Sequence, residues 1–364
     1  MKKNKIVIHD FCGHPFTFEL AEEFFKQSEN IHYLYTNDDV GPKADFNNTN
    51  CKFTNISVGY NIPKTNPFRR FIWEIRYAFL LRRKLASIKP DYLICSNTPI
   101  IVLLIILIGK KFKFIWWVQD IFSEAAIKLK VIPKVIRYPV YKILQLIELI
   151  ISKKSSSIIL ISDNFRIFVN EKYHKKIKVI ENWPSSNHSD MISNKKIKSI
   201  IYAGTIGFKH GNEKISETIR HTLKKNFKFI LISQGKNADA LKRKFAKHKN
   251  FHGYDFIPYS DLIKKISMSM GALFVLDDSA SRLSIPSKAY TYILCRTPVL
   301  GICDPSHHLA KTINKNNIGI VNDLDAFFKG INNAEIYDSW MENIASCSDN
   351  FKINKKYKAF KKVL

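Results

Sequence analysis

The 364-residue sequence is poor in acidic side chains. It has 31 Asp and Glu against 58 Lys and Arg, which gives a formal net charge of +27. A charge of this size indicates an anionic partner or surface. Nucleic acid, membrane phospholipid and a phosphorylated substrate are all compatible with it.

The sequence also lacks a long apolar run. The longest one, residues 99–108, falls well short of the roughly 20 residues that a membrane-spanning helix needs. The apolar run near the N-terminus, residues 6–8, is too short for a signal peptide and predicts a first strand. We therefore expect a protein that does not span a membrane.

Cysteine and glycine motifs are missing as well. The six cysteines form no CxxC pair and have no histidine spacing typical of a zinc site, which favours a reduced, cytosolic setting without a metal. No GxGxxG follows the first predicted strand, so the dinucleotide fingerprint of an NAD enzyme is absent.

Short apolar runs alternate with helical patterns along the whole chain, which predicts an α/β protein. Strands are expected at residues 5–9, 31–36, 51–56, 91–95, 112–118, 158–161 and 178–184, and again at 199–202, 227–232, 272–275 and 298–301. The polar residues 185–198 predict a linker. We therefore expect an N-terminal domain at 1–184, a C-terminal domain at 199–345 and a basic C-terminal helix or tail at 346–364.

Two segments of the first half are both basic and apolar. Residues 67–85 predict a helix with arginines around an apolar face. The apolar side chains of this face are Phe68, Phe71, Ile72, Ile75, Phe79 and Leu80. This is either a core helix with solvated arginines or a helix on a membrane surface. Residues 130–154 are similar in composition, and Pro133 and Pro139 are expected to break their early part.

Two stretches of the second half suit a phosphate group. A predicted strand ends in glycines that are followed by a lysine: Gly204, Thr205, Gly207 and Lys209. Later, residues 285–288 predict a helix start that carries Ser287 and Lys288. Together they predict a diphosphate held between a loop and a helix N-terminus; an ordinary turn with a solvated lysine is the alternative.

Polar residues follow several predicted strands. Asn97 follows the strand at 91–95, and Gln119 and Asp120 follow the strand at 112–118. The carboxyl ends of parallel strands meet at one edge of a sheet, so these side chains should converge there with the loop at residues 13–14. Taken alone, Asp120 is also a typical helix cap. Asp277 and Asp278 end a strand of the second half, where paired aspartates are usually solvated.

Seven segments, in this order, resemble the family 4 retaining glycosyltransferases of the branch that builds bacterial surface polysaccharide (O-antigen or capsule): GHPFTFELA (13–21), SNTP (96–99), WWVQDIFS (116–123), ISDNF (161–165), IENWP (180–184), YAGTIGFKH (202–210) and IPSKAYTYILCRTPVL (285–300). The resemblance implies a GT-B fold, in which two Rossmann-like domains face each other across a cleft. The second domain would hold a sugar nucleotide and the first an acceptor.

The resemblance also implies roles for single residues. The diphosphate would lie against six of them: Gly204, Thr205, Gly207, Lys209, Ser287 and Lys288. Gly235 would lie in a nucleotide-contacting turn, and Asn97, Gln119 and Asp120 would face the transferred sugar and the acceptor. The chain departs from the family's pattern in three places. The family's paired glutamates would fall near Leu283 and Thr291, which are not acidic. Arg296 stands where the family usually has glycine, and Gln119 stands where many members have histidine. Asp277 and Asp278 are therefore the candidates for a missing carboxylate.

The resemblance implies transfer of a hexosyl or N-acetylhexosaminyl group, with retention of configuration, from a UDP-sugar, and the two basic, apolar segments predict a polyprenyl-diphosphate-linked saccharide as the acceptor. Lysines and a helix dipole would stabilise the leaving diphosphate, so no cofactor or metal is expected. The two basic segments predict a peripheral position on the anionic inner face of the cell membrane. A nucleotide-sugar epimerase, a nucleic-acid-binding protein and a non-catalytic member of a synthesis complex remain alternatives, although no nucleic-acid-binding module is recognised.

Overall fold

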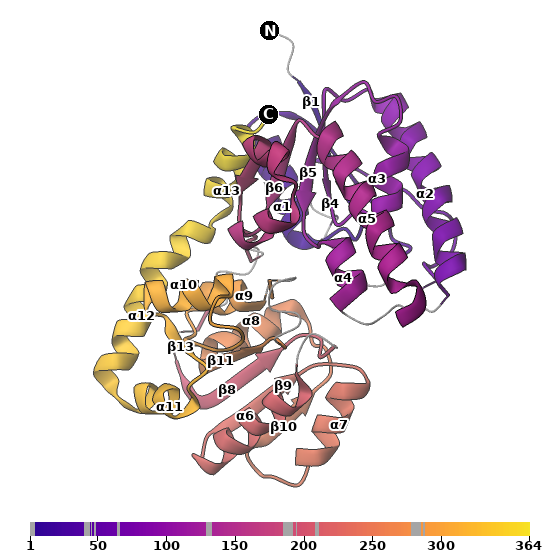
Figure 1. Cartoon of the computed structure of the whole chain (residues 1–364). Coiled ribbons are helices and arrows are strands. Elements are labelled where there is room, and N and C mark those ends of the chain that lie inside the picture. Colours follow the sequence, from indigo (N-terminus) through magenta and orange to yellow (C-terminus); the bar gives the residue numbers. More distant parts are fainter. Residues whose placement is uncertain are drawn as a thin grey trace. The chain divides into compact units, whose positions relative to one another are not determined.

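The computed structural model describes residues 4–39, 44, 46, 49–63, 66–128, 133–184, 192–193, 195–207, 211–277, 285–286 and 288–364. The chain forms two compact units (Figure 1). Unit 1 comprises Met1–Glu181 and Ile353–Leu364, and unit 2 comprises Asn182–Lys352. No helix among the described residues is long and apolar enough to cross a membrane.

Unit 1 is built on a sheet of seven parallel strands in the order β3-β2-β1-β4-β5-β6-β7. The strands are β1 (Lys5–Asp10), β2 (Asn30–Tyr35), β3 (Lys52–Asn55), β4 (Tyr92–Ser96), β5 (Lys113–Val118), β6 (Ser157–Leu160) and β7 (Ile177–Val179). The order reverses between β1 and β4, which is where ligands bind in open sheets of this kind. The register pairs Asp10 with Ser96 at this point.

The helices of unit 1 are α1 (Pro15–Lys26), α2 (Pro67–Ile88), α3 (Ile100–Ile106), α4 (Phe122–Lys128), α5 (Lys134–Lys154) and α13 (Ile353–Lys361). Helices α2, α3 and α5 pack side by side, whereas α1 packs against α13 (Figure 1). Right-handed crossovers put α1 on the opposite face of the sheet from α2, α3 and α5, because the strand order reverses at β1.

Helix α2 turns a different face to the sheet from the one that its apolar spacing predicted. Its buried side chains are Trp73, Tyr77, Ala78, Leu81 and Leu85. The predicted apolar face is largely exposed, and Phe68 and Phe79 are 71% and 60% accessible. The larger indole and phenol rings of Trp73 and Tyr77 fill the space over the sheet. The prediction that α2 packs on the core was therefore right, but the face predicted to pack was wrong.

The prediction that prolines break the second basic segment was also wrong for Pro139. Pro133 precedes the first residue of α5, but Pro139 lies inside the helix, which runs on to Lys154. Pro139 is the sixth residue of α5, so it removes one backbone hydrogen bond, to the carbonyl four residues before it, without ending the helix. The exposed apolar side chains of α5 are Val135, Ile136, Tyr138, Ile143 and Leu146.

Unit 2 has a second parallel sheet, in the order β10-β9-β8-β11-β12-β13. Its strands are β8 (Ile197–Ala203), β9 (Lys228–Ile232), β10 (Phe251–Tyr254), β11 (Ser269–Val275), β12 (Val299–Ile302) and β13 (Gly319–Val321). The sequence did not predict β10 and β13, which are short. The strand order reverses between β8 and β11, so the carboxyl end of β8 lies at the switch point.

The helices of unit 2 are α6 (Asn212–Lys224), α7 (Lys236–Phe245), α8 (Tyr259–Met268), α9 (Lys288–Leu294), α10 (His308–Asn316), α11 (Leu324–Asn332) and α12 (Ala334–Ser348). Helix α9 begins at Lys288, later than the predicted start at Pro286. One apolar cluster joins the sheet to α6, α7, α11 and α12 through side chains such as Ile219, Leu241 and Phe327. After α12, the chain returns to unit 1, where α13 packs on α1.

Candidate functional site

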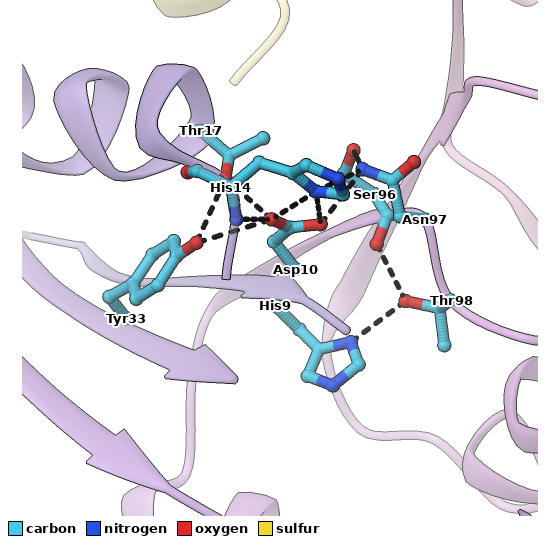
Figure 2. Close-up of polar contacts among 8 residues, drawn as sticks. All are labelled: His9, Asp10, His14, Thr17, Tyr33, Ser96, Asn97 and Thr98. Carbon is cyan, nitrogen blue, oxygen red and sulfur yellow. Dashed lines mark hydrogen bonds and ion pairs between the residues drawn. The ribbon is translucent and has the colours of Figure 1, made fainter. Parts of the chain in front are cut away.

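A buried carboxylate organises the carboxyl edge of the sheet in unit 1. Asp10 ends β1 and accepts hydrogen bonds from four neighbouring residues, the weakest from Tyr33 OH to Oδ2 at 3.3 Å (Figure 2). The backbone N–H of His14 donates to Oδ2 at 2.5 Å, Thr17 Oγ1 donates to Oδ2 at 2.7 Å, and Asn97 Nδ2 donates to Oδ1 at 2.8 Å. Burial alone would raise the pKa of Asp10, but the nearby His14 and the hydrogen bonds from His14, Asn97 and Thr17 hold it below its usual value. The carboxylate is therefore charged at neutral pH.

The imidazole of His14 is oriented by this carboxylate. Its Nδ1 lies 3.1 Å from Asp10 Oδ2, and the side chain is 29% accessible (Figure 2). When Nδ1–H donates to a carboxylate, the basic lone pair is on Nε2, which is the arrangement of a general base. Asn97 next to it has a left-handed backbone, with φ of 50°. Asparagine tolerates this conformation, which places its amide over Asp10.

A pocket of about 390 Å³ lies at the same edge, and the structure brings three predicted site residues together in it: Asn97, Gln119 and Asp120. Its walls include Trp116, Trp117 and Phe122, and its charged lining also includes Asp39 and Arg70. Aromatic faces beside carboxylates and amides offer both apolar contact and hydrogen bonds to a polar, ring-shaped ligand. The pocket thus suits a sugar.

The loop that carries Gln119 and Asp120 is fixed from α5. Glu148 is buried there and accepts hydrogen bonds from Ser123 Oγ at 2.6 Å and from the Ser123 backbone N–H at 3.2 Å. Burial raises the pKa of Glu148, while the bonds from Ser123 and Phe122 act in the opposite direction. Glu148 therefore satisfies the first turn of α4, and the exposed Asp120 lines the pocket.

The second predicted corner lies at the carboxyl end of β8 in unit 2. Gly204 has φ of 123°, and a Cβ added to it would lie 3.3 Å from Lys288 Nζ. Lys288 Nζ donates to Tyr202 OH at 2.7 Å and lies 4.0 Å from the centre of the Tyr202 ring. Desolvation lowers the pKa of Lys288 to about 7. Because Gly204 has no side chain, the amine of Lys288 can lie close to the backbone at this position.

Other predicted residues of unit 2 lie near the carboxyl ends of its strands. Thr205 is exposed, and its carbonyl accepts a hydrogen bond from Tyr202 OH at 3.2 Å. Gly207 follows in the same loop. Gly235 precedes α7 with φ of 104° and has no atom within 4 Å of an added Cβ. Asp277 lies two residues after the end of β11 and is partly buried. Predictions for Lys209, Asp278 and Ser287 lie outside the described residues.

Sequence reasoning did not include Asp10 and His14 among the site residues, although it placed the 13–14 loop at this edge. The available pattern was an acidic residue that ends the first strand and is followed four positions later by histidine. Such a pattern is common in solvated turns. What distinguishes Asp10 is its complete burial among four donor residues, one of which, Asn97, lies in a strand connection far along the chain.

No family model matches the chain. A curated relative, the "Probable glycosyltransferase WbjE" of Pseudomonas aeruginosa, is 21% identical over an alignment of 283 residues that covers 71% of this chain and 70% of the relative. A crystal structure of a glycosyltransferase from Rickettsia africae superposes with a TM-score of 0.69 at 13% identity and covers 100% of this chain and 98% of that one. The chain has the GT-B fold. The predicted fold, with two Rossmann-like domains, and the resemblance to a GT-B glycosyltransferase are thereby confirmed.

Two further solved structures share this fold. An α-glucosyltransferase in complex with UDP and DNA has a TM-score of 0.61 at 12% identity, with 99% of this chain and 100% of that chain covered. A UDP-N-acetylglucosamine 2-epimerase has a TM-score of 0.57 at 11% identity, with 98% and 94% covered. The GT-B fold of this chain is therefore shared by proteins that transfer sugars and by one that isomerises a nucleotide sugar.

Proposed function

We propose that this protein is a glycosyltransferase that moves a sugar from a UDP-sugar to a lipid-linked saccharide in the synthesis of bacterial surface polysaccharide. The observation that carries the proposal is the placement of Lys288 beside the open backbone of Gly204 at the switch point of unit 2. An amine at this point can stabilise the charge that develops on a leaving diphosphate. The similarity to WbjE, and the UDP bound in the related α-glucosyltransferase, support this choice of reaction and nucleotide.

The proposal assigns the acceptor to the pocket of unit 1. Phe122, a partly exposed aromatic residue of the lining, offers apolar surface to a sugar ring, and Asn97, Gln119 and Asp120 offer hydrogen bonds to its hydroxyls. His14, held by Asp10, is the group at this edge suited to take a proton from an acceptor hydroxyl. Retention of configuration is part of the proposal and rests on the resemblance to family 4.

The proposal also includes a position on the anionic inner face of the cell membrane. Exposed apolar side chains of α2 and α5, such as Phe68, Phe79 and Val135, stand among arginines and lysines. This composition is typical of helices that lie on a membrane surface. A lipid-linked acceptor would be reached from this position without a spanning helix.

The test is to incubate the purified chain with labelled UDP-sugars, with and without a bacterial lipid extract. We expect label to enter the organic phase only when both the chain and the lipid are present. Conversion of the UDP-sugar to an isomer without lipid would support the epimerase, which the similarity to a UDP-N-acetylglucosamine 2-epimerase favours as second candidate. Loss of lipid labelling in Lys288→Met would assign the activity to this chain and not to a contaminant.

A further inference from the structure

Arg70 lies in the acceptor pocket, although the sequence grouped it with the solvated arginines of α2. Among the described residues that line this pocket it is the sole cation, and Asp39 and Asp120 are the carboxylates. A cavity that presents one guanidinium together with aromatic rings and two carboxylates suits a ligand that combines an anionic group with a sugar.

The guanidinium of Arg70 is held at one nitrogen. Its Nε donates to Glu74 Oε1 at 2.9 Å, with side-chain accessibilities of 48% for Arg70 and 13% for Glu74. Burial raises the pKa of Glu74, and Arg70 acts against this shift. The structure records no hydrogen bond or ion pair for Nη1 or Nη2 within the described part of the chain. Glu74 therefore orients the side chain and leaves the forked end for another anion.

Exposed phenylalanines lie next to Arg70 on the same helix. Phe68 and Phe71 are 71% and 46% accessible, and their spacing of three residues puts them on one side of α2. The first turns of α2 thus offer a cation toward the pocket and apolar rings toward solvent. A ligand with a sugar, a phosphate and a hydrocarbon chain, in that order, matches this sequence of surfaces.

We propose that Arg70 binds the phosphate that joins the acceptor saccharide to its lipid, and that Phe68 and Phe71 contact the first part of the hydrocarbon chain. This inference rests on the proposed function and names the group that recognises the acceptor. Arg70 takes no part in bond making; it fixes the phosphate so that the saccharide extends toward Asp120. Bidentate binding of phosphate by arginine gives the contact its geometry.

The experiment uses the full chain and geranyl diphosphate, a soluble prenyl diphosphate, in calorimetric titrations. Inorganic diphosphate and geraniol serve as the two halves of the probe. We expect the complete probe to bind more tightly than either half, and Arg70→Gln to weaken it by roughly tenfold or more, as expected for loss of a charge-assisted contact. Arg69→Gln, which removes a neighbouring arginine that does not line the pocket, is the matched control and should change the affinity less than twofold.

Two more variants separate binding from folding. Arg70→Gln leaves the partly buried Glu74 without its cation, which could destabilise the fold. The double variant Arg70→Gln/Glu74→Gln removes both charges, so it should fold normally but still bind geranyl diphosphate weakly. Arg70→Lys should retain the charge but not the bidentate geometry, and give an intermediate affinity. Equal affinity for geranyl diphosphate in the native chain and in the double variant would overturn the proposal.

Titration with UDP distinguishes this inference from the proposed function. We expect UDP to bind the native chain and Arg70→Gln equally, because the nucleotide is assigned to unit 2. A parallel loss of UDP affinity in Arg70→Gln would overturn the role of Arg70 in acceptor binding. Normal UDP binding without any binding of geranyl diphosphate would also overturn it and leave glycosyl transfer intact, whereas absence of UDP binding in the native chain would contradict the UDP-dependent transfer itself.

Discussion

Phe360 of the last helix contacts Trp117 of β5 edge to face, with 4.7 Å between the ring centroids. Trp117 also contacts Phe16 of α1 at 5.8 Å, and both Trp117 and Phe360 are buried. Because Trp117 lies two residues before Gln119, the C-terminal helix supports the strand that ends at the pocket of unit 1. The C-terminal helix α13 is therefore part of the core of unit 1.

Phe360→Ala should destabilise unit 1 by roughly 3–5 kcal/mol, because it leaves a cavity next to a tryptophan that the surrounding helices cannot fill. Urea unfolding followed by tryptophan fluorescence measures this change. Phe25→Ala is the matched control, since Phe25 is 40% accessible and its loss should cost far less. Equal effects of the two substitutions would contradict the supporting role of Phe360.

Asp10→Asn should destabilise unit 1 at neutral pH by roughly 3 kcal/mol, because charged acceptors give the stronger hydrogen bonds and the amide leaves some donors without a partner. The pKa of Asp10 is lowered in the folded state, so its contribution is complete above the unfolded value of about 4 and is lost as the pH falls through the folded value. The difference between the two proteins should therefore shrink in acid. A difference that stays constant from pH 7 to pH 3 would argue against this.

The sequence predicted the parallel strands well because buried strands of this type are short, apolar and rich in β-branched residues. It also predicted that Asn97, Gln119 and Asp120 would meet, since residues that follow parallel strands share one edge of the sheet. These predictions needed only local patterns and one topological rule. They could therefore be made without knowledge of any side-chain contact.

The face of α2 could not be predicted in the same way. Two sets of side chains both recur at helical spacing, one with Phe68, Phe71 and Phe79, the other with Trp73, Tyr77 and Leu81. Which set packs depends on the shape of the space over the sheet, and this is a tertiary property. The same choice decides that Arg70 lines a pocket, so its proposed role could emerge only from the structure.

Asp120→Asn should lower turnover at least tenfold and change the melting temperature by no more than about 2 °C, because Asp120 is exposed and Glu148 already satisfies the first turn of α4. Turnover with a UDP-sugar and scanning calorimetry measure the two effects. Glu148→Gln is the contrasting variant, and it should lower stability more than Asp120→Asn. Loss of stability with normal turnover in Asp120→Asn would instead support a helix cap.

UDP should bind more weakly as the pH rises from 7 to 9. Desolvation lowers the pKa of Lys288 to about 7, so the free protein holds this amine largely neutral above that pH. A bound diphosphate favours the charged amine, and binding must then take up a proton, which weakens the affinity by at most tenfold per pH unit. Titrations in buffers of different ionisation enthalpy measure the proton uptake. The Lys288→Met variant should bind UDP weakly and take up no proton on binding. Proton uptake that persists in this variant would show that another group takes up the proton.

The exposed apolar side chains of α5 should hold the protein on anionic vesicles. Val135 and Ile143 are 89% and 58% accessible, so glutamate at both positions should leave the fold intact while it removes apolar contact and adds repulsion. We expect the native chain to sediment with anionic vesicles at low salt and less with neutral ones, since each nearby Lys or Arg contributes about 1 kcal/mol that salt screens. The double variant should remain largely in the supernatant.

Phe256→Glu, in unit 2 at a side chain that is 54% accessible, is the control and should sediment like the native chain. Equal sedimentation of all three proteins under every condition would show that α5 does not contact the membrane.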